Sequence, residues 1–471
     1  MTVPSSDFLQ SRRFPLNKLF GHLEQSFSYV SILGTDVVGK SFSVSSKVTS
    51  ITDGQWCERG FVVRCYREGR YFEYAFNKMP TDDARVHDLA KRIIRKASLA
   101  GGEAFLYPEP LDESHVAIYR EPLGKLPSEV GPDEIIARLS DMTKKMHELS
   151  PLVVEAQASF NYAKVSKLFL SPRKNIEQNY IWSGAHLWPT ARRDGVTRHS
   201  YKGFAGLKGL ELLDEMSEGI PSAVSNACKM LDAKPITPGE YDVICSPEAV
   251  GIIAHEAFGH GVELDMFLKN RANAREYMGK QVASPIVTMH DGAQAAQQVS
   301  SYKFDDEGNP GGDTVIIKNG ILRAGISDAL SAALLETPPT GNGKRETYAN
   351  KAYSRMTNTF IAPGKDKLED MIKSIKHGYL IEAAESGMED PKDWGIQVMF
   401  SYAREIIDGE VTDNWVAPVV MTGYVPDLLK SVTMVSDTLE LFGSGACGKG
   451  YKEWVKVSDG GPYIKAKARL G

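Results

Sequence analysis

The stretch TPGEYDVICSPEAVGIIAHEAFGHGVELD (237–265) decides how the second half of the chain folds. Near its start, the short apolar run YDVIC predicts a β-strand. Ser246 follows as a helix N-cap, and Pro247 occupies the first helical position, which tolerates the missing N–H. The apolar residues of AVGIIAHEAF continue the helix. The sequence therefore predicts a strand followed directly by a helix that starts near 247 and carries HEAFGH.

Two histidines, His255 and His260, stand five positions apart on this predicted helix. On an ideal α-helix that spacing rotates the second side chain by about 140° from the first, so the rings would point apart. Gly259 and Gly261 flank the second histidine, and glycine permits a break, a one-residue bulge or the end of the helix at this point. We therefore predict a distortion of the helix that turns His260 back towards His255.

The residue types of this motif match metal-assisted peptide hydrolysis. Zinc binds neutral imidazoles, and a catalytic zinc site keeps one position for a water molecule, whose pKa falls to about 7. Glu256 directly follows His255, and we expect it to face the zinc-bound water, accept its proton and pass that proton to the leaving amine. The alternative is that these polar residues are satisfied in an ordinary protein environment and bind no metal.

The third ligand is open on local grounds. Glu263 and Asp265 are carboxylate candidates on the same segment, although a solvated helix end would explain both of them. Cys447 is distant in sequence but lies in GSGACGKG (443–450), where the glycines predict a flexible loop that can reach a ligand. Thiolate is a strong zinc donor. The other interpretation of Cys447 is a small buried residue in a tight turn.

The composition limits the class of protein. Of the 471 residues, 42% are hydrophobic and 24% charged, which is typical of a soluble globular protein large enough for two domains. We see no apolar run near the roughly 18 residues that a membrane span needs, and no signal-peptide pattern at the start. The net charge of −5 disfavours nucleic-acid binding. Five scattered cysteines favour a reducing compartment, so we expect a cytoplasmic protein without membrane or nucleic-acid partners.

The pattern along the chain alternates between helical and strand periodicity. Runs at 61–66 and 70–76 predict a β-hairpin, as does 314–322 with its Asn319-Gly320 turn. Helices are predicted at 83–99, after Gly131-Pro132, at 206–232, from 247 and at 366–377, and mixed strand and loop at 152–204. We place a domain boundary after the helix at 206–232, which gives domains 1–232 and 233–471.

Several blocks of the second half also resemble a known family. They are HEAFGHGVELD (255–265), FDDEGNPGG (304–312), PTGNGKRETYA (339–349), SRMTNTFIAPG (354–364) and GSGACGKG (443–450). In this order they resemble the TldD branch of the TldD/PmbA family of bacterial and archaeal metalloproteases, once described as modulators of DNA gyrase. The first half matches more loosely, through GFVVRCYREGRYFEYAF. The resemblance implies an α+β fold, with an N-terminal α+β domain and a C-terminal catalytic domain built on a β-sheet core.

The resemblance also implies a site and partners. It makes His255, His260 and Cys447 the ligands of one zinc ion per chain and Glu256 the catalytic acid/base, which favours Cys447 over Glu263 as the third ligand. It implies dimers that enclose a chamber, either homodimers or heterodimers with a PmbA/TldE-type paralogue lacking the HExxxH motif. Substrates would be unfolded or extended small peptides, and we expect them to bind by strand addition to a sheet edge.

Three functions are consistent with these observations. A zinc endopeptidase is favoured, since the full set of His255, Glu256, His260 and Cys447 is present. The alternative is a non-catalytic peptide-binding or regulatory subunit of a TldD/PmbA-type complex. A DNA- or gyrase-binding factor is disfavoured by the acidic charge balance. The group that stabilises the oxyanion is open; Tyr348 and Arg345 are candidates, with loop packing as the other interpretation.

Overall fold

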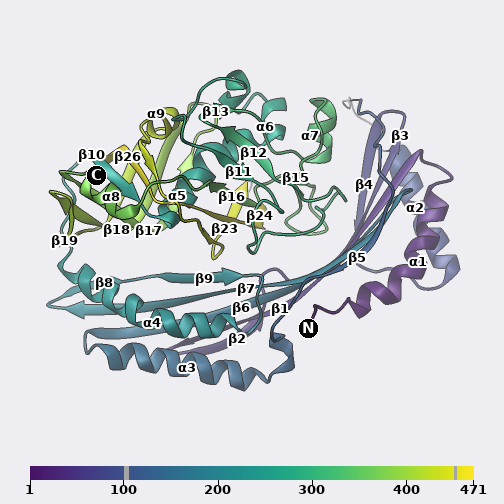
Figure 1. Ribbon diagram of the computed structural model, residues 1–471. Helices are drawn as coiled ribbons and strands as arrows, with labels where there is room; N and C mark the ends of the chain where they lie inside the picture. Colours follow the sequence, from purple (N-terminus) through teal and green to yellow (C-terminus); the bar gives the residue numbers. More distant parts are fainter. Residues whose placement is uncertain (100–105, 450–452) are drawn as a thin grey trace.

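The computed structural model describes residues 1–99, 106–449 and 453–471 (Figure 1). It confirms the predicted α+β class, since helices and strands both occur in each half of the chain. The first half forms one large sheet with helices against it, and the second half forms two further sheets that lie above that large sheet in Figure 1.

The first half contains nine strands and four α-helices among its described residues. The strands are β1 (Tyr29–Ser45), β2 (Thr49–Asp53), β3 (Glu58–Arg67), β4 (Arg70–Phe76), β5 (His115–Arg120), β6 (Val153–Leu170), β7 (Lys174–Arg193), β8 (Val196–His199) and β9 (Lys202–Gly206). The helices are α1 (Asp7–Leu23), α2 (Asp83–Leu99), α3 (Pro132–Leu149) and α4 (Leu212–Lys229). The main path of the sheet is β4-β3-β1-β6-β7-β5, and β2 joins β1 while β8 and β9 join β7.

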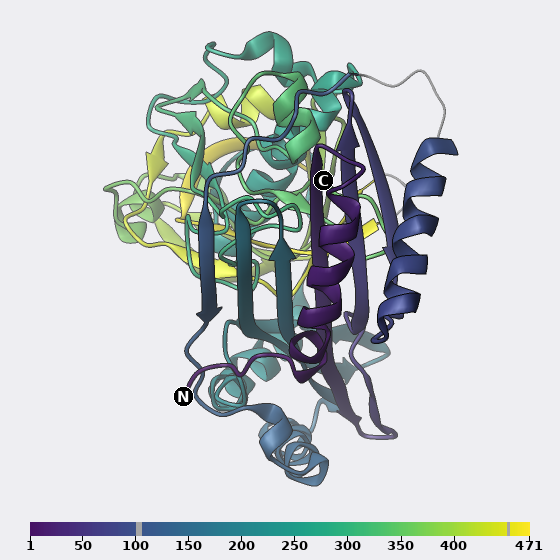
Figure 2. The ribbon, with the colours of Figure 1, turned by 90° about the vertical axis from the view of Figure 1, so that its right-hand side faces the viewer.

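Alternation along the strands gives this sheet two different faces. Side chains on a strand point to opposite faces in turn, and the even-numbered residues of β1 and β6, such as Ile32 and Phe160, are buried in clusters with the helices. Figure 2 shows α1 and α2 lying along the strands at one end. Odd-numbered residues such as Leu33 and Phe169 instead pack against Phe304 of the second half. The sheet is therefore sandwiched between its helices and the second half of the chain.

Among its described residues, the second half has one sheet of seven strands and one of six, together with two short hairpins. Its strands are β10 (Gly239–Cys245), β11 (Met289–Asp291), β12 (Thr314–Lys318), β13 (Ile321–Leu322), β14 (Gly343–Lys344), β15 (Tyr353–Ser354), β16 (Asn358–Ile361), β17 (His377–Glu389), β18 (Gly395–Ile407), β19 (Glu410–Val416), β20 (Val419–Tyr424), β21 (Met434–Val435), β22 (Glu440–Phe442), β23 (Ala446–Lys449), β24 (Glu453–Lys456), β25 (Ser458–Gly461) and β26 (Ile464–Leu470). Its α-helices are α5 (Pro247–Ala254), α6 (Leu264–Leu268), α7 (Ala329–Leu334), α8 (Leu368–Lys373) and α9 (Val425–Lys430).

The seven-stranded sheet closes on itself. Its path runs β10-β17-β18-β20-β26, and β26 pairs with β10 as well. The six-stranded sheet has the order β13-β12-β11-β16-β25-β22. Helix α5 contributes Val250 and Ile253, both fully buried, to the core that joins the two sheets. The predicted strand and helix of 237–265 thus form the centre of the second half.

Both predicted hairpins are confirmed, and so is the helix at 83–99. At the first turn, Glu68 and Gly69 adopt positive φ angles of 52° and 79°. At the second turn, Asn319 and Gly320 adopt positive φ angles of 50° and 79°. Such angles at both central residues define the type I′ turn that suits a twisted hairpin.

Three other predicted segments differ from the structure. The stretch 152–204 was expected to mix strand and loop, yet most of it belongs to β6, β7 and β8, with the start of β9. One face of β6 and β7 carries small residues such as Ser159 and Gly184. The alternation of apolar and polar residues along these strands is therefore weak in the sequence. Helix α8 ends at Lys373, because the chain turns into β17 at His377, and α4 begins at Leu212, since β9 continues to Gly206.

The domain boundary after residue 232 stays a prediction. It falls between the last strand of the first sheet, which ends at Gly206, and the first strand of the second half, which starts at Gly239. In the parts of the chain that the structure describes, we find no helix with both the length and the apolarity needed to cross a bilayer.

Candidate metal centre

The motif helix begins as predicted and then changes its winding. The Ser246 side chain accepts a hydrogen bond from the Ala249 amide at 3.4 Å, and Pro247 is the first residue of α5. From His255 to Gly259 the helix becomes a π-helical turn, in which the amide of His260 donates to the carbonyl of His255. Phe258 leaves the helical region, with φ −130° and ψ 18°. The predicted distortion is confirmed, and of the forms considered it is the one-residue bulge.

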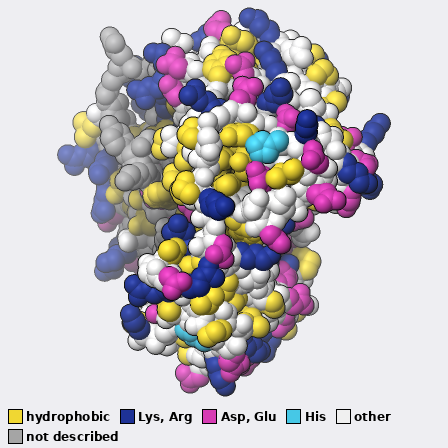
Figure 3. Space-filling model, turned by 90° about the vertical axis from the view of Figure 1, so that its left-hand side faces the viewer, with side chains coloured by type: hydrophobic (Ala, Val, Ile, Leu, Met, Phe, Trp, Pro, Cys, Tyr) yellow, Lys and Arg dark blue, Asp and Glu magenta, His cyan; other side chains and the backbone are white. Residues whose placement is uncertain are grey.

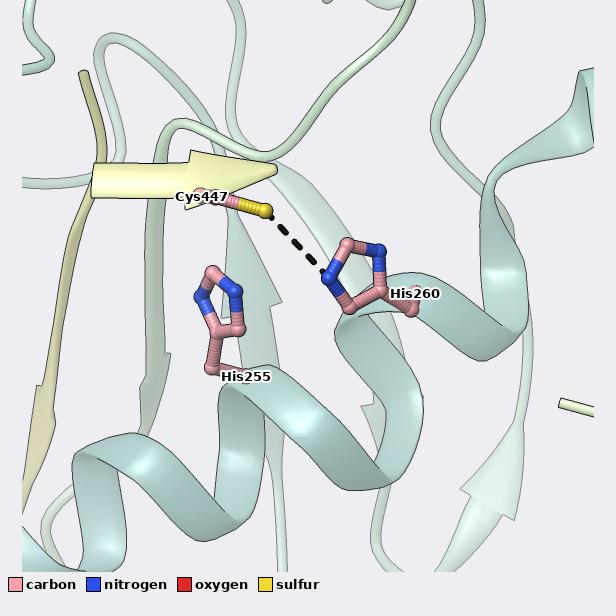
Figure 4. Close-up of side chains that lie close together, drawn as sticks. All are labelled: His255, His260 and Cys447. Atoms are coloured by element: carbon pink, nitrogen blue, oxygen red, sulfur yellow. Dashed lines mark hydrogen bonds between the residues drawn. The ribbon is translucent and has the colours of Figure 1, made fainter. Parts of the chain in front are cut away.

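This extra residue brings the two histidine rings together. Their centroids lie 5.2 Å apart with the planes at 88°, and Figure 4 shows both side chains on the same side of the distorted helix. Gly259 leaves room for Met356 beside the bulge, since a Cβ atom there would lie 2.0 Å from the sulfur of Met356. A π-bulge adds one residue to a helical turn, which offsets the unfavourable rotation of a five-residue spacing.

Cys447 reaches the histidines from a remote part of the chain. Its Sγ lies 3.2 Å from Nε2 of His260 (Figure 4). One possible ligand atom from each of His255, His260 and Cys447 lies within 4.8 Å of the others. The expectation of a flexible glycine loop is wrong, because Cys447 is buried on strand β23, which pairs with β24. Gly450, the last residue of GSGACGKG, lies outside the described residues.

Glu263 lies behind His260. Its Oε2 is 3.2 Å from Nδ1 of His260, so it can accept a hydrogen bond from this nitrogen while Nε2 faces Cys447. Lys449 Nζ lies 3.0 Å from the same carboxylate and donates to Asp265 at 2.6 Å. Carboxylates that hold a ligand histidine by its other nitrogen fix the orientation of the ring. The geometry therefore gives Glu263 and Asp265 cationic partners in the protein.

Arg355 is a residue that the sequence reasoning missed. Its side chain is 1% exposed, and Nη2 donates to the carbonyl of Cys447 at 2.8 Å and to Sγ at 3.2 Å. Its Nε lies 3.7 Å from Oε1 of Glu263. The available signal was its place in the block SRMTNTFIAPG, which had no chemical interpretation. Arg355 thus touches both the sulfur and the carboxylate behind His260.

The electrostatics favour a thiolate at Cys447. Burial alone would raise the pKa of the Cys447 thiol, but His255 and His260 lower this pKa well below its usual range. Burial would likewise lower the pKa of His260, yet Glu263 and Cys447 raise it well above the ordinary value. Burial would raise the pKa of Glu263, whereas Lys449 and His260 lower it to about 2. Thiolate is the form of cysteine that binds metals.

Glu256 lies in the wall of a large cavity beside these three residues. The cavity has a volume of about 970 Å³, and His255, His260 and Cys447 line it as well. Glu256 is 9% exposed. Gly387 of β17 leaves room for its side chain, since a Cβ atom at position 387 would lie 2.6 Å from Cγ of Glu256. The structure therefore brings together all four residues predicted for the site.

The donor set fits a zinc ion. With Zn–N near 2.05 Å and Zn–S near 2.3 Å, two donors of a tetrahedral site lie about 3.3–3.6 Å apart, and the 3.2 Å between Cys447 and His260 is close to this range. Three protein ligands with a fourth position left open are typical of a catalytic zinc site.

Residues 238–468 match the family model of the PmbA/TldA metallopeptidase C-terminal domain. This half of the chain belongs to the TldD/PmbA metallopeptidase family. The resemblance to the TldD branch is thereby confirmed, and several relatives of the chain are named TldD homologs. The TldD/PmbA half includes every residue of the candidate metal centre, from the motif helix to Cys447.

Two relatives and one solved structure show the extent of the similarity. A protein named metalloprotease from Methanocaldococcus jannaschii is 33% identical over 280 residues, 59% of this chain and 61% of that protein. A zinc metalloprotease TldD homolog of Saccharolobus solfataricus is 33% identical over 230 residues, 49% of this chain and 51% of that protein. The chain thus spans about half to three-fifths of these relatives. The structure of TldE from Thermococcus kodakarensis has the same fold, with a TM-score of 0.76 at 20% identity, over 97% of this chain and 99% of that chain.

Two other TldD/PmbA blocks hold the halves of the chain together. Arg345 pairs with Glu73 of β4 at 2.6 Å, and the Tyr348 amide donates to Glu58 of β3 at 2.7 Å. Glu307 pairs with Arg64 at 2.5 Å. Neither Arg345 nor Tyr348 lines the cavity that contains Glu256. The geometry therefore favours the packing interpretation of both residues over a role at the oxyanion.

Proposed function

We propose that this chain is a zinc-dependent endopeptidase that hydrolyses unfolded or extended small peptides. His255, His260 and Cys447 would hold one zinc ion per chain, and Glu256 would serve as general base and then general acid. The observation that carries the proposal is that one possible ligand atom from each of two imidazoles and a cysteine side chain lies within 4.8 Å of the others, beside a nearly buried glutamate in a cavity. The metalloprotease names of the relatives support it.

Each residue of the centre would have a separate task. Zinc, when bound, acts as a Lewis acid and lowers the pKa of a coordinated water to about 7. The Glu256 carboxylate would accept the proton of the attacking water and deliver it to the leaving amine. Glu263 would hold the His260 ring through Nδ1, and Arg355 would hold the Cys447 sulfur. These outer contacts would keep the three ligands in one arrangement.

A free sheet edge beside the cavity suits an extended peptide. Strand β10 pairs with β17 only along Gly378–Ile381. From Glu382 to Glu389, β17 pairs with β18 on its other side, and no strand of the described chain adds to the remaining edge. Residues 383–389 line the cavity. We propose that the peptide adds here as a strand, because its main chain would then supply the hydrogen bonds.

Metal removal tests the function as a whole. We expect about one zinc per chain by elemental mass spectrometry, and cleavage of a flexible peptide that stops when a chelator removes the metal and returns when zinc is restored. The reason is that both the nucleophile and the oxyanion depend on the metal. Protein that holds zinc but cleaves no unfolded peptide, alone or with a TldE-type partner, would contradict the proposal. It would favour the non-catalytic, peptide-binding alternative.

Arg355 gives a sharper test of the centre. Changing Arg355→Met removes the hydrogen bond to the sulfur while keeping much of the apolar volume, and we expect zinc affinity to fall by about 10- to 100-fold. Chelator competition measures the affinity, and circular dichroism checks the fold. Arg404→Met is the matched control, since Arg404 pairs with Glu382 at 2.6 Å rather than with the metal centre. Unchanged zinc affinity in a folded Arg355→Met protein would remove Arg355 from the centre.

We also propose a dimeric assembly in the cytoplasm, formed with a second copy or with a PmbA/TldE-type paralogue. The shared fold with a solved TldE supports a partner of this kind. A nucleic-acid partner stays disfavoured by the net charge of −5. On the face shown in Figure 3, positive and negative side chains are interspersed. Light scattering of this protein, measured alone and mixed with the paralogue, distinguishes the homodimer from the heterodimer.

A further inference from the structure

Three aromatic residues of the first half of the chain line the same cavity as the metal centre. They are Trp188 of β7, His199 of β8 and Tyr201 just before β9, here called the aromatic wall. The rings of Trp188 and His199 stack at 4.8 Å with an angle of 25°, and Tyr201 meets Trp188 edge-on at 5.7 Å. The cavity therefore combines chemistry from one half of the chain with an aromatic surface from the other.

Strand alternation explains why these rings face the cavity. Along β7 the odd-numbered residues Ala185 and Leu187 are buried among the helices on one face of the sheet. Trp188 must then point to the other face, which is the face that the second half of the chain covers. The residue is 36% exposed, so packing within this chain does not cover it completely. Figure 1 shows β8 and β9 on the side of the first sheet nearest β17 and β23.

The character of the neighbouring groups points to an apolar occupant. Two carboxylates of the cavity already have partners, because Glu248 accepts a hydrogen bond from the Ala384 amide and Glu385 accepts one from Ser401 at 2.5 Å. Burial lowers the pKa of His186, which meets Tyr201 at 5.5 Å, so a neutral ring is favoured there. Exposed aromatic rings in a concave site gain most by covering apolar surface.

We infer that the aromatic wall is a specificity subsite that receives one aromatic or large aliphatic side chain of the peptide. The inference rests on the proposed function, since it assumes that the occupant of the cavity is a peptide. A peptide strand added to the edge of β17 presents alternate side chains to opposite sides. The side chains on one side of the peptide strand face the first sheet. Trp188 covers the one side chain among them that it contacts. The main chain then supplies general affinity, and Trp188 supplies the preference.

Binding to an inactive form separates this inference from hydrolysis. The zinc-loaded, full-length Glu256→Gln protein is titrated with flexible peptides that are identical except for Phe, Lys or Ala at one position, moved stepwise along the peptide. Covering one large apolar side chain strengthens binding by about tenfold or more. We expect this gain for Phe over Ala at one position, its loss in a Trp188→Ala background and its retention in Trp188→Phe. Val196→Ala, on the adjacent strand β8 and outside the cavity lining, is the control.

The other possible outcomes either overturn the proposed subsite or separate it from the proposed function. A Phe preference that survives Trp188→Ala, a stronger preference for Lys, or equal binding of all three peptides at every position would overturn it. If wild-type protein cleaves peptides but the binding pattern is absent, the subsite fails and the proposed function stands. If the binding pattern is present but the zinc-loaded wild type, alone or with its partner, cleaves none of the peptides, the proposed function fails and the subsite stands.

Discussion

Changing Glu256→Gln is expected to lower the rate of peptide cleavage by at least about a hundredfold and to leave the zinc content unchanged. General acid–base catalysis contributes about 10²- to 10⁴-fold to such reactions, and an amide of the same shape cannot accept the proton from water. Glu256 lines the cavity beside the three proposed ligands but is not among the group of possible metal donors. Cleavage of an unfolded peptide and elemental analysis of the same preparation measure the two quantities.

A carboxylate elsewhere in the cavity gives the control. Glu385 lies on the cavity wall and accepts a hydrogen bond from Ser401. We expect Glu385→Gln to change the cleavage rate by much less than Glu256→Gln, although both remove one negative charge from the same cavity. A Glu256→Gln protein that cleaves at the parent rate would show that another group takes the proton. Loss of zinc from this variant would instead make Glu256 a ligand.

The local part of the site could be predicted from the sequence. Ser246 and Pro247 mark the helix start by their chemistry alone, and the five-residue spacing of His255 and His260 requires a distortion if both rings are to face one ion. The π-helical turn at 255–259 meets this requirement. These features depend on residues close together in the chain, and local backbone rules describe them.

The contacts between distant segments could not be predicted in the same way. Cys447 lies 187 positions from His260. The residues alone left it one candidate ligand beside Glu263 and Asp265, and the family resemblance decided in its favour. Arg355 carried no recognisable pattern, because a lone arginine in a sequence gives no sign that its guanidinium is buried against a sulfur. The long strands β6 and β7 were missed because their second face is partly polar, and the partner that covers part of it lies more than a hundred residues further on.

Changing Cys447→Ser should weaken zinc binding more than any change outside the ligand set. Serine keeps the size of the side chain but its hydroxyl stays protonated near neutral pH, whereas the two histidines hold Cys447 as a thiolate with a pKa well below the usual range, although burial alone would raise that pKa. Outer contacts contribute about 10- to 100-fold to metal affinity, so loss of a ligand should exceed the loss in Arg355→Met. Chelator competition gives the affinity, and a cobalt-substituted protein should lose its sulfur-to-metal charge-transfer band.

Two further variants decide what a different result would mean. Cys57→Ser is the matched control, because Cys57 is exposed and its thiol donates to the carbonyl of Gly39, away from the centre. Glu263→Gln keeps the shape of the carboxylate that lies within hydrogen-bond distance of His260, a proposed ligand. If Cys447→Ser keeps its zinc while Glu263→Gln loses it, the third ligand is Glu263. If Cys447→Ser loses the charge-transfer band and Glu263→Gln retains it with a 10- to 100-fold weaker affinity, the sulfur is the ligand and the carboxylate orients His260.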